Sequence, residues 1–389
     1  MKINAIMIAT LPLLLLMLGS GLGIRAAWCE TPPPPSEDLP PEQSIMPPIQ
    51  CGSYRDVDEG RIESVAFSPD GKTLAAGNAS GMIKYFDPAT ARPTASFRVQ
   101  KRIEGGIGAL DFAPDGKTLA TLDAMVNVAL LEAATGRPRL TLESPRFSPN
   151  RSHVSAVAYA PDGKAVAAGY HSGEVVLWDA VTGRRRFVMP PYIIPEHTFS
   201  APFPKVTLAH PAGIASLVFS PDGATLASLG AVVRLWDVAT GQERRTLSKP
   251  MHRYSSRLAF SPDGGTLAVG DRSVEPGGLP TTLTFWDPES GRKRAESTTR
   301  EGISGLAYLP GGRTLVSVER EDVIRLRDAE VGRPLAGLRF DHHYEAECLA
   351  VSPDGRLIAA GGTSKSGEFG FIQLIETDGK TLRPWKPRP

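Results

Sequence analysis

The fold is decided by a pattern that is most complete in the stretch LVFSPDGATLASLGAVVRLWDVATGQERRT, at Leu217–Thr246. An apolar alternation leads into Ser220-Pro221-Asp222-Gly223, where the fixed φ of proline and the tolerance of glycine for positive φ predict a tight turn. A strand of small residues follows, and the next strand ends in Trp236-Asp237. A second turn, at Thr240-Gly241, precedes a polar segment with arginines. The stretch therefore predicts four short antiparallel strands, named a to d below.

The proline turn recurs along the whole chain. Its seven copies begin at Ser68, Ala113, Ala160, Ser220, Ser261, Leu309 and Ser352. Successive prolines lie 41 to 60 residues apart, a spacing that is typical of propeller blades rather than of helical solenoids. The strand ending in an aromatic-acid pair recurs with the turn, for example at Trp178-Asp179, and weaker copies end at Glu132, Asp328 and Glu376. Seven units of one four-stranded kind therefore predict an all-β fold.

From about Arg61 to the C-terminus, the two-turn, four-strand unit resembles the WD-repeat (Trp-Asp repeat) β-propeller family. The resemblance implies a seven-bladed β-propeller of four-stranded antiparallel blades, which we interpret as a bacterial-type, exported member. In that family a His, a Ser or Thr, an Asp and the Trp of strand c often form a hydrogen-bonded tetrad. Here only His210 and His342 match the His position, and Ser80 and Ser172 replace the Asp. We therefore expect the tetrad to be absent, and the blades to depend on aromatic packing and ring closure.

The N-terminal region indicates export. Lys2 is followed by an apolar run from Ala5 to Leu18 and then by small residues, as in a signal peptide or an N-terminal membrane anchor. We assign residues 1–28 to this segment, 29–55 to a Pro-rich linker, and 56–389 to the propeller. The expected location is periplasmic or extracellular, with or without a membrane tether.

Two strands compete to complete the last blade. We favour the C-terminal segment Lys380–Trp385, because it follows its turn in the same register as the other d strands. The alternative is an N-terminal strand near Ile49–Tyr54.

Charge and cysteine content exclude several classes of protein. The formal net charge is +1, so no global field favours nucleic acid. The three cysteines, Cys29, Cys51 and Cys348, are too few for a disulfide framework. A Cys51–Cys348 bridge is one alternative, but we favour Cys348 as a small buried residue of an inner strand.

The connections of variable length point to a binding face. The a–b and c–d turns are short and share one face of a propeller, whereas the length variation falls in the d–a and b–c connections of the other face. The largest insertion, Pro190–Pro211, combines aromatic residues with stiffening prolines, a mixture suited to binding. The candidate partner-binding residues are Tyr192, His197, Phe199, Phe203, His171 and His343. The alternative is that the insertion folds over blades 3 and 4.

No catalytic or cofactor motif is present, and we expect neither catalytic residues, nor cofactors, nor a metal site. All seven histidines map to the candidate face, but only the adjacent His342-His343 pair shows ligand spacing. Asp111 and Arg257 are the charged residues of inner strands that we expect to line the central channel. The arginine groups at 184–186 and 292–294 lie on outer strands, where we expect charge to protect exposed edges.

The sequence thus predicts a non-catalytic protein-protein interaction scaffold outside the cytoplasm, built as a monomeric propeller. Its partner is expected to be a protein or peptide, not a nucleic acid, and its only membrane contact is expected through the N-terminal segment. The alternative is an envelope enzyme, or a small-ligand or metal-binding propeller with a site at the channel mouth, formed by His342 and His343. A further alternative, the tetrad-free propellers of envelope assembly or of serine peptidases, shares the proline turns but not the Trp-Asp strands.

Overall fold

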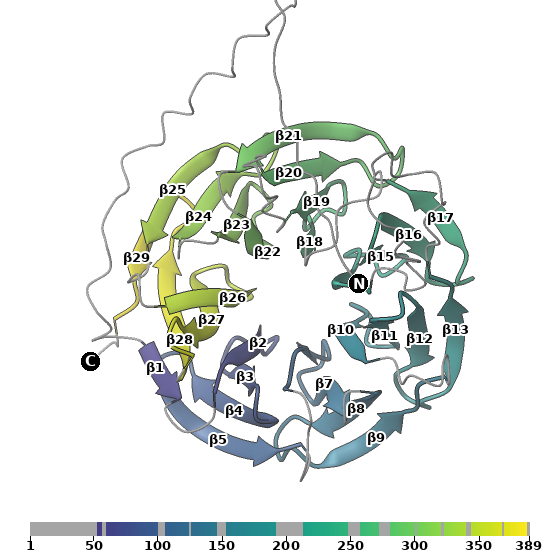
Figure 1. Cartoon of the computed structure of the whole chain (residues 1–389), viewed down its shortest axis with the longest axis horizontal. Helices are drawn as coiled ribbons and strands as arrows, with labels where there is room; N and C mark the ends of the chain where they lie inside the picture. The colour runs from purple at the N-terminus through teal and green to yellow at the C-terminus, as the bar shows by residue number, and fades with distance from the viewer. Residues whose placement is uncertain are drawn as a thin grey trace, which may run out of the picture. The chain divides into compact units, whose positions relative to one another are not determined.

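A computed structural model describes residues 53–56, 60–99, 106–123, 126–145, 153–191, 213–247, 257–271, 281–299, 302–319, 323–339, 344–367 and 369–386. Within these ranges the strands form seven sheets, one for each blade, arranged in a ring (Figure 1). Neighbouring strands of each sheet are antiparallel, and in blades 1 to 6 they follow chain order from the centre outwards. The predicted seven-bladed, all-β propeller of four-stranded blades is confirmed.

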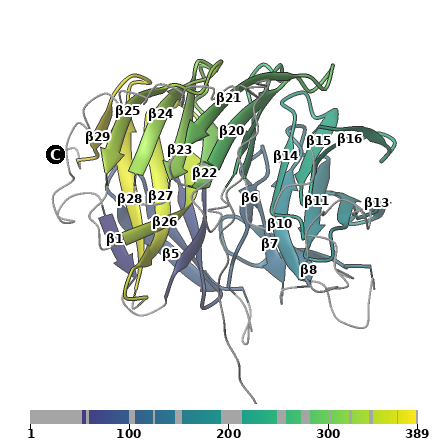
Figure 2. The same ribbon diagram turned by 45° about the horizontal axis from the view of Figure 1, so that its top comes forward.

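Each blade contributes one strand to each of four concentric positions, and Figure 2 shows inner strands such as β10, β14 and β22 around the centre of the ring. In blades 1 to 7, strand a is β2 (Ile62–Phe67), β6 (Leu110–Phe112), β10 (Val154–Tyr159), β14 (Ser216–Phe219), β18 (Arg257–Phe260), β22 (Ile303–Tyr308) and β26 (Tyr344–Val351). Strand b is β3 (Leu74–Asn78), β7 (Thr118–Asp123), β11 (Ala165–Tyr170), β15 (Thr225–Leu229), β19 (Leu267–Gly270), β23 (Thr314–Glu319) and β27 (Leu357–Ser364).

The outer half of each blade is formed by strands c and d. Strand c is β4 (Met82–Asp87), β8 (Asn127–Glu132), β12 (Val175–Asp179), β16 (Val233–Asp237), β20 (Thr281–Trp286), β24 (Val323–Asp328) and β28 (Gly370–Thr377). In blades 1 to 6, strand d is β5 (Arg92–Arg98), β9 (Pro138–Leu142), β13 (Arg185–Met189), β17 (Glu243–Thr246), β21 (Lys293–Thr299) and β25 (Pro334–Arg339). Blade 7 has β29 (Leu382–Pro384) and β1 (Ser53–Asp56) at this position.

In the copies that begin with serine, the proline turn is held by its own serine and aspartate. In blade 1 the Ser68 hydroxyl donates to Asp70 Oδ1 at 2.6 Å and accepts the backbone N–H of Thr73 at 3.0 Å. Gly71 has a φ of +69°, which only glycine adopts without steric cost, and its N–H donates to the Ser68 carbonyl. The serine hydroxyl lowers the pKa of Asp70 below its usual range. The short motif therefore specifies the turn locally.

The hydrophobic core lies between neighbouring blades. One cluster joins strands of blades 2 and 3 around Trp178, and another joins blades 3 and 4 around Trp236. Both indoles are almost fully buried, and burial of a large apolar side chain contributes roughly 1.5–3 kcal/mol. The fully buried Ala167 and Ala168 of β11 face opposite sides of their sheet, so small side chains allow blades to pack on both faces.

The family tetrad survives only in part. In blade 4, Trp236 Nε1 donates to the Ser228 hydroxyl at 2.8 Å, which is one of the tetrad contacts that we expected to be absent. In blade 5, where Val269 occupies the serine position, Trp286 Nε1 donates instead to Thr284 of its own strand at 3.0 Å. The expectation is therefore wrong for the Trp–Ser contact of blade 4.

Blade 6 has an ionic substitute for this contact. Arg327 occupies the Trp position of β24, and its Nε donates to the Ser317 hydroxyl at 3.1 Å, as the indole of Trp236 does in blade 4. Its Nη2 donates to Glu319 Oε1 at 2.5 Å, while its Nη1 donates to the Gly332 carbonyl at 2.8 Å. The Arg327 and Glu319 side chains are only 3% and 5% exposed. A buried ion pair thus fills the site of the missing indole.

Ring closure uses both ends of the described chain. β29 pairs with the last part of β28, from Ile375 to Thr377, and β1 pairs with its first part, from Gly370 to Gln373. Between them, the N–H of Trp385 donates to the Leu374 carbonyl at 3.3 Å. Our preference for the C-terminal strand alone is therefore wrong, because the two segments together make strand d of blade 7. β1 includes Ser53, which we had placed in the linker.

Cys348 is buried in β26, where its thiol donates to the Gly361 carbonyl at 3.3 Å. It is a free cysteine, and burial raises its pKa to about 12, so it is unreactive. The interpretation of Cys348 as a small buried residue is confirmed, whereas Cys51 lies outside the described residues.

The outer arginines do more than protect edges. In blade 3, Arg186 Nη2 donates to Oδ2 of Asp179, the acid that ends strand c, and this lowers the pKa of Asp179 below its usual range. Equivalent pairs recur in the next two blades with the same seven-residue spacing. The pairs are Asp179–Arg186 at 2.6 Å, Asp237–Arg244 at 2.5 Å and Asp287–Arg294 at 2.7 Å. These arginines bind strand d to the end of strand c through ion pairs. Our expectation that they only protect exposed edges is therefore corrected.

Candidate partner-binding face

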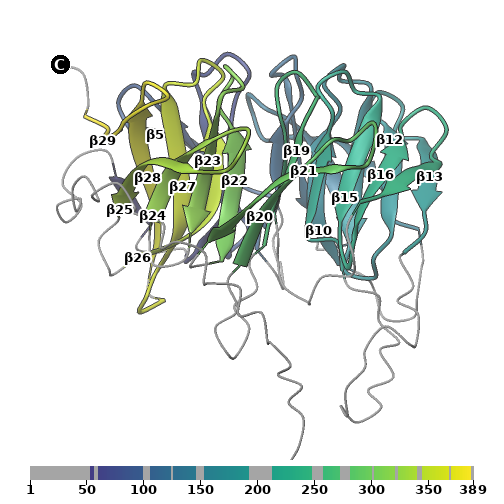
Figure 3. The same cartoon turned by 90° about the horizontal axis from the view of Figure 1, so that it is seen from above.

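The connections on the two faces of the ring differ in length. In blade 1 the a–b and c–d turns span only residues 68–73 and 88–91. The d–a connection from β13 to β14 spans residues 190–215, and the b–c connection of blade 5 spans residues 271–280. Successive connections in an antiparallel sheet alternate between its ends, so the long ones lie opposite the tight turns. Figure 3 shows the ring edge-on, with tight turns along one side.

On the turn face, each of the seven proline turns contacts the proline turn of the preceding blade. A β-carbon added at Gly71 would lie 3.6 Å from Cδ of Pro353 in the preceding blade, and each of the other proline turns repeats this contact. The neighbours are Gly71–Pro353, Gly116–Pro69, Gly163–Pro114, Gly223–Pro161, Gly264–Pro221, Gly312–Pro262 and Gly355–Pro310. Because these seven turns are short and alike, the connections that distinguish one blade from another lie on the opposite face.

The long insertion begins at a fixed point of blade 4. Arg234 Nη1 donates to the Pro190 carbonyl at 2.7 Å. The guanidinium lies 4.1 Å from the ring centroid of Trp236 and also pairs with Glu243. Met189, the last residue of β13, is fully buried. The start of the insertion is therefore attached to both blades that it connects.

The end of the insertion is fixed on blade 3. The N–H of Ile214 donates to the Tyr170 carbonyl at 2.9 Å, and the Ser155 hydroxyl donates to the Ile214 carbonyl at 2.5 Å. Ile214 is 6% exposed and packs on Gly169, where an added β-carbon would lie 2.3 Å from its Cγ2. Both ends of the insertion are thus held rigidly, on the face that carries the longer connections.

Two histidines, His153 and His171, lie beside the point where the chain returns from the insertion to blade 4. The N–H of His171 donates to the His153 carbonyl at 2.9 Å, and the two imidazole rings are 6.2 Å apart between centroids, at an interplanar angle of 83°. Gly213 packs against His171, because a β-carbon added there would lie 2.8 Å from the His171 Cα. Both histidines are exposed. Because the two histidines are far apart in the sequence, a pattern of short ligand spacings does not reveal that they lie close together.

Of the predicted binding residues, the structure places His171 beside the end of the insertion. The remaining five, Tyr192, His197, Phe199, Phe203 and His343, lie outside the described residues. Their roles stay predictions.

Asp111 makes a contact between two blades. Its Oδ2 accepts the backbone N–H of Tyr159 at 2.7 Å, linking β6 of blade 2 to β10 of blade 3. Burial raises the pKa of the Asp111 carboxyl to about 7, although N–H donors from Tyr159 and Phe112 act in the opposite direction. Asp111, which we expect to line the channel, thus also links two blades. Arg257 is half-buried at the start of β18.

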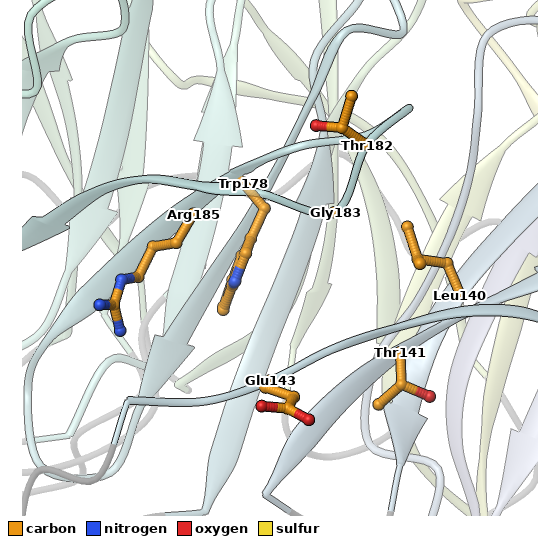
Figure 4. Close-up of a pocket in the computed structure, with 7 residues that line it drawn as sticks. All are labelled: Leu140, Thr141, Glu143, Trp178, Thr182, Gly183 and Arg185. Atoms are coloured by element: carbon orange, nitrogen blue, oxygen red, sulfur yellow. The ribbon is translucent and has the colours of Figure 1, made fainter.

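A shallow, open pocket of about 490 Å³ lies on the rim between blades 2 and 3. Figure 4 shows Glu143 and Thr141 on the blade 2 side, with Arg185 and Trp178 on the blade 3 side. The Trp178 side chain is only 1% exposed, so little of its ring is available to a ligand. Glu143 and Arg185 are the ionisable residues of this lining, which also includes the hydroxyl groups of Thr141 and Thr182.

The part of the chain that the structure describes also bears on metal binding and membrane insertion. There, no three His, Cys, Asp or Glu side chains gather closely enough to hold a metal ion. Nor do the described residues contain a helix with the length and apolar character needed to span a membrane.

Comparison with known proteins identifies the repeats. Residues 52–87, 143–179 and 203–237 match the WD domain, G-beta repeat family (WD40). Over 127 residues, 32% of this chain, it is 33% identical to centriole proteome protein 16 of Chlamydomonas reinhardtii, covering 5% of that protein. Over 183 residues, 45% of this chain, it is 26% identical to WD repeat-containing protein SL1-17 of Schistosoma mansoni, covering 54% of it.

This chain therefore spans about half or less of the length of these two relatives. Both are eukaryotic proteins, so they give no support to the bacterial, exported type that we predicted. Their similarity and the matched segments nevertheless agree with the seven four-stranded blades of the structure. The chain is a seven-bladed β-propeller, and its residues 52–87, 143–179 and 203–237 are similar to WD40 repeats.

Proposed function

We propose that this protein is a non-catalytic interaction scaffold that binds a protein or peptide through the face carrying the d–a and b–c connections. WD40 propellers typically serve as protein-interaction scaffolds and are usually non-catalytic. The observation that carries the proposal is the attachment of the 190–215 connection at both ends, through Pro190 and Ile214. Fixed attachment points reduce the conformational freedom that a segment loses on binding, which lowers the entropic cost.

The chemistry of the insertion suits a partner with apolar anchors. Tyr192, Phe199 and Phe203 are the aromatic side chains expected to make the central contacts, because aromatic residues dominate binding hot spots. His197 is expected to contribute polar contacts from the same segment. His171, exposed beside the end of the insertion, and His343, from the last blade, extend the expected surface across the face.

We further propose that the protein acts outside the cytoplasm. The support comes from Lys2, the apolar run from Ala5 to Leu18 and the proline-rich segment after it, which together have the order of a signal or anchor and a spacer. Fusion of the first 60 residues to a reporter that is active only after export tests this directly. Reporter activity comparable to that of a known signal is expected, and activity confined to the cytoplasm would overturn it.

The binding proposal is tested by replacing residues 192–203 with a Gly-Ser linker of equal length. Partners captured by the full chain from the native cell fraction are identified by mass spectrometry, and their interaction is then measured with purified proteins. The replacement is expected to abolish binding while circular dichroism and melting temperature stay unchanged. Binding of equal affinity by the folded variant would contradict the proposal.

A control and a milder variant sharpen the result. Val181 is 70% exposed in a c–d turn of the opposite face, so Val181→Ser removes an apolar side chain without loss of packing and is expected to bind normally. Arg234→Ala removes the bond to the Pro190 carbonyl. It is expected to weaken binding roughly 3- to 30-fold, because the segment must then be ordered on binding at about 0.5–1.5 kcal/mol for each affected side chain.

A further inference from the structure

Blade 3 places two imidazoles together at the ends of adjacent strands. His153 immediately precedes β10, and His171 immediately follows β11. Their backbones are joined by the bond from His171 N–H to the His153 carbonyl, at 2.9 Å. The ring centroids lie 6.2 Å apart with the rings nearly perpendicular. The positions of the two backbones are therefore set by the pairing of β10 with β11.

The pair is accessible as well as fixed. Both histidines are exposed, so their ring nitrogens can exchange water for another ligand. The backbone of Gly213 packs closely against the backbone of His171, since a β-carbon added at Gly213 would lie 3.0 Å from the His171 carbonyl oxygen. Only side-chain torsions need to change for the two rings to turn towards a common point.

We propose that His153 and His171 form a two-histidine site for a divalent transition-metal ion, with Cu²⁺ bound most tightly. A histidine nitrogen lies about 2.0–2.1 Å from such an ion, which places the ring centroid roughly 3.2 Å from it. Two rings on one ion are then roughly 4.5 Å apart at a right angle between the bonds and roughly 6.4 Å apart on opposite sides of the ion, so the observed 6.2 Å fits two ligands on nearly opposite sides. Imidazole suits copper, nickel and zinc, and the affinity order of divalent ions favours Cu²⁺.

The site is incomplete within the part of the chain that the structure describes, because no third His, Cys, Asp or Glu joins the pair there. The remaining coordination positions are open to water or to a side chain of a bound protein. The proposal goes beyond the interaction function and does not depend on it, since metal binding is measured on this protein alone. It also departs from our expectation that the chain has no metal site.

The test is a Cu²⁺ titration of the full, tag-free chain by calorimetry near pH 7.5, with glycine as a competing ligand. One strong site is expected, and His153→Ala and His171→Ala are each expected to weaken it roughly 10- to 100-fold, because chelation by the second ring is lost. His252→Ala serves as the matched control and is expected to bind as the wild type does. Mg²⁺ is expected not to bind, since it prefers oxygen ligands.

Electron paramagnetic resonance of the stoichiometric Cu²⁺ complex identifies the ligands. Coupling to two imidazole nitrogens is expected in the wild type, and to one in either variant. Equal Cu²⁺ affinity in the wild type and both variants, or a wild-type spectrum with one imidazole nitrogen or none, would overturn the proposal. Because both side chains are exposed, the alanine variants are expected to fold, which circular dichroism checks.

Discussion

Replacement of Asp111 by asparagine should change how the stability of the propeller depends on pH. Asp111 accepts the backbone N–H of Tyr159 across the boundary between blades 2 and 3. Burial raises its folded-state pKa to about 7, from an ordinary value of 3.8. Asparagine retains an oxygen that can accept the same N–H but has no proton to lose. The substitution therefore removes the titration and keeps the contact.

The sign follows from the raised pKa. The folded protein holds the Asp111 proton up to about pH 7, whereas the unfolded chain releases it near pH 3.8, so wild-type stability is full below 3.8 and falls as the pH rises through this window. At about 1.4 kcal/mol for each pKa unit, the total loss is between about 4 and 5 kcal/mol. About 3 kcal/mol of this loss is expected between pH 5 and pH 9.

Urea unfolding of the wild type and Asp111→Asn at pH 5 and pH 9 measures this difference. The free energy of unfolding of the variant, relative to the wild type, is expected to be about 3 kcal/mol more favourable at pH 9 than at pH 5. Asp115→Asn, which removes an exposed carboxylate from the neighbouring turn, is the charge-matched control. A relative stability of Asp111→Asn that is the same at both pH values would refute the reasoning, because Asp111 would then be ionised in the folded protein.

Three further substitutions test the packing. Ala91 has a φ of +52°, so Ala91→Gly is expected to raise the free energy of unfolding by about 0.5–1 kcal/mol; a lower melting temperature would contradict this. Glu319→Ala leaves the Arg327 charge buried without its partner and is expected to lower the free energy of unfolding by about 3–5 kcal/mol, measured in urea. Adding Arg327→Met is expected to restore most of this stability, and no recovery would argue against the ion-pair explanation. Trp385→Ala is expected to cost about 3–5 kcal/mol, and a loss below 1 kcal/mol would show that blade 7 closes without the indole.

The blades could be predicted because their determinants are local. In Ser68-Pro69-Asp70-Gly71 the fixed φ of proline, the serine and aspartate bonds and the positive φ of glycine act within one turn, so the repeat itself reports the structure. Strand c could be recognised in the same way from Trp236 and its neighbours. The short turns also implied the division of the ring into a turn face and a face with longer connections.

The candidate site was predictable only in part, because its contacts join residues that are distant in the chain. The insertion was evident from the 60-residue interval that contains it, but its attachment to Arg234 depends on a side chain of the following blade. The approach of His153 to His171 depends on the pairing of β10 with β11. Short residue spacings identify metal ligands that lie on one helix or in one turn. His153 and His171 are instead separated by the whole β10–β11 hairpin.

The sequence by itself therefore determined the number of blades, the order of strands in each and the turns between them, since each depends on residues within about one repeat. Only the tertiary structure decided how strand d of blade 7 is shared by β1 and β29, because the ends of the chain meet only when the ring closes. It also decided that Arg327 and Glu319 replace an indole in blade 6, and that Asp111 joins two blades. Such contacts arise from the packing of complete sheets, which no local pattern encodes.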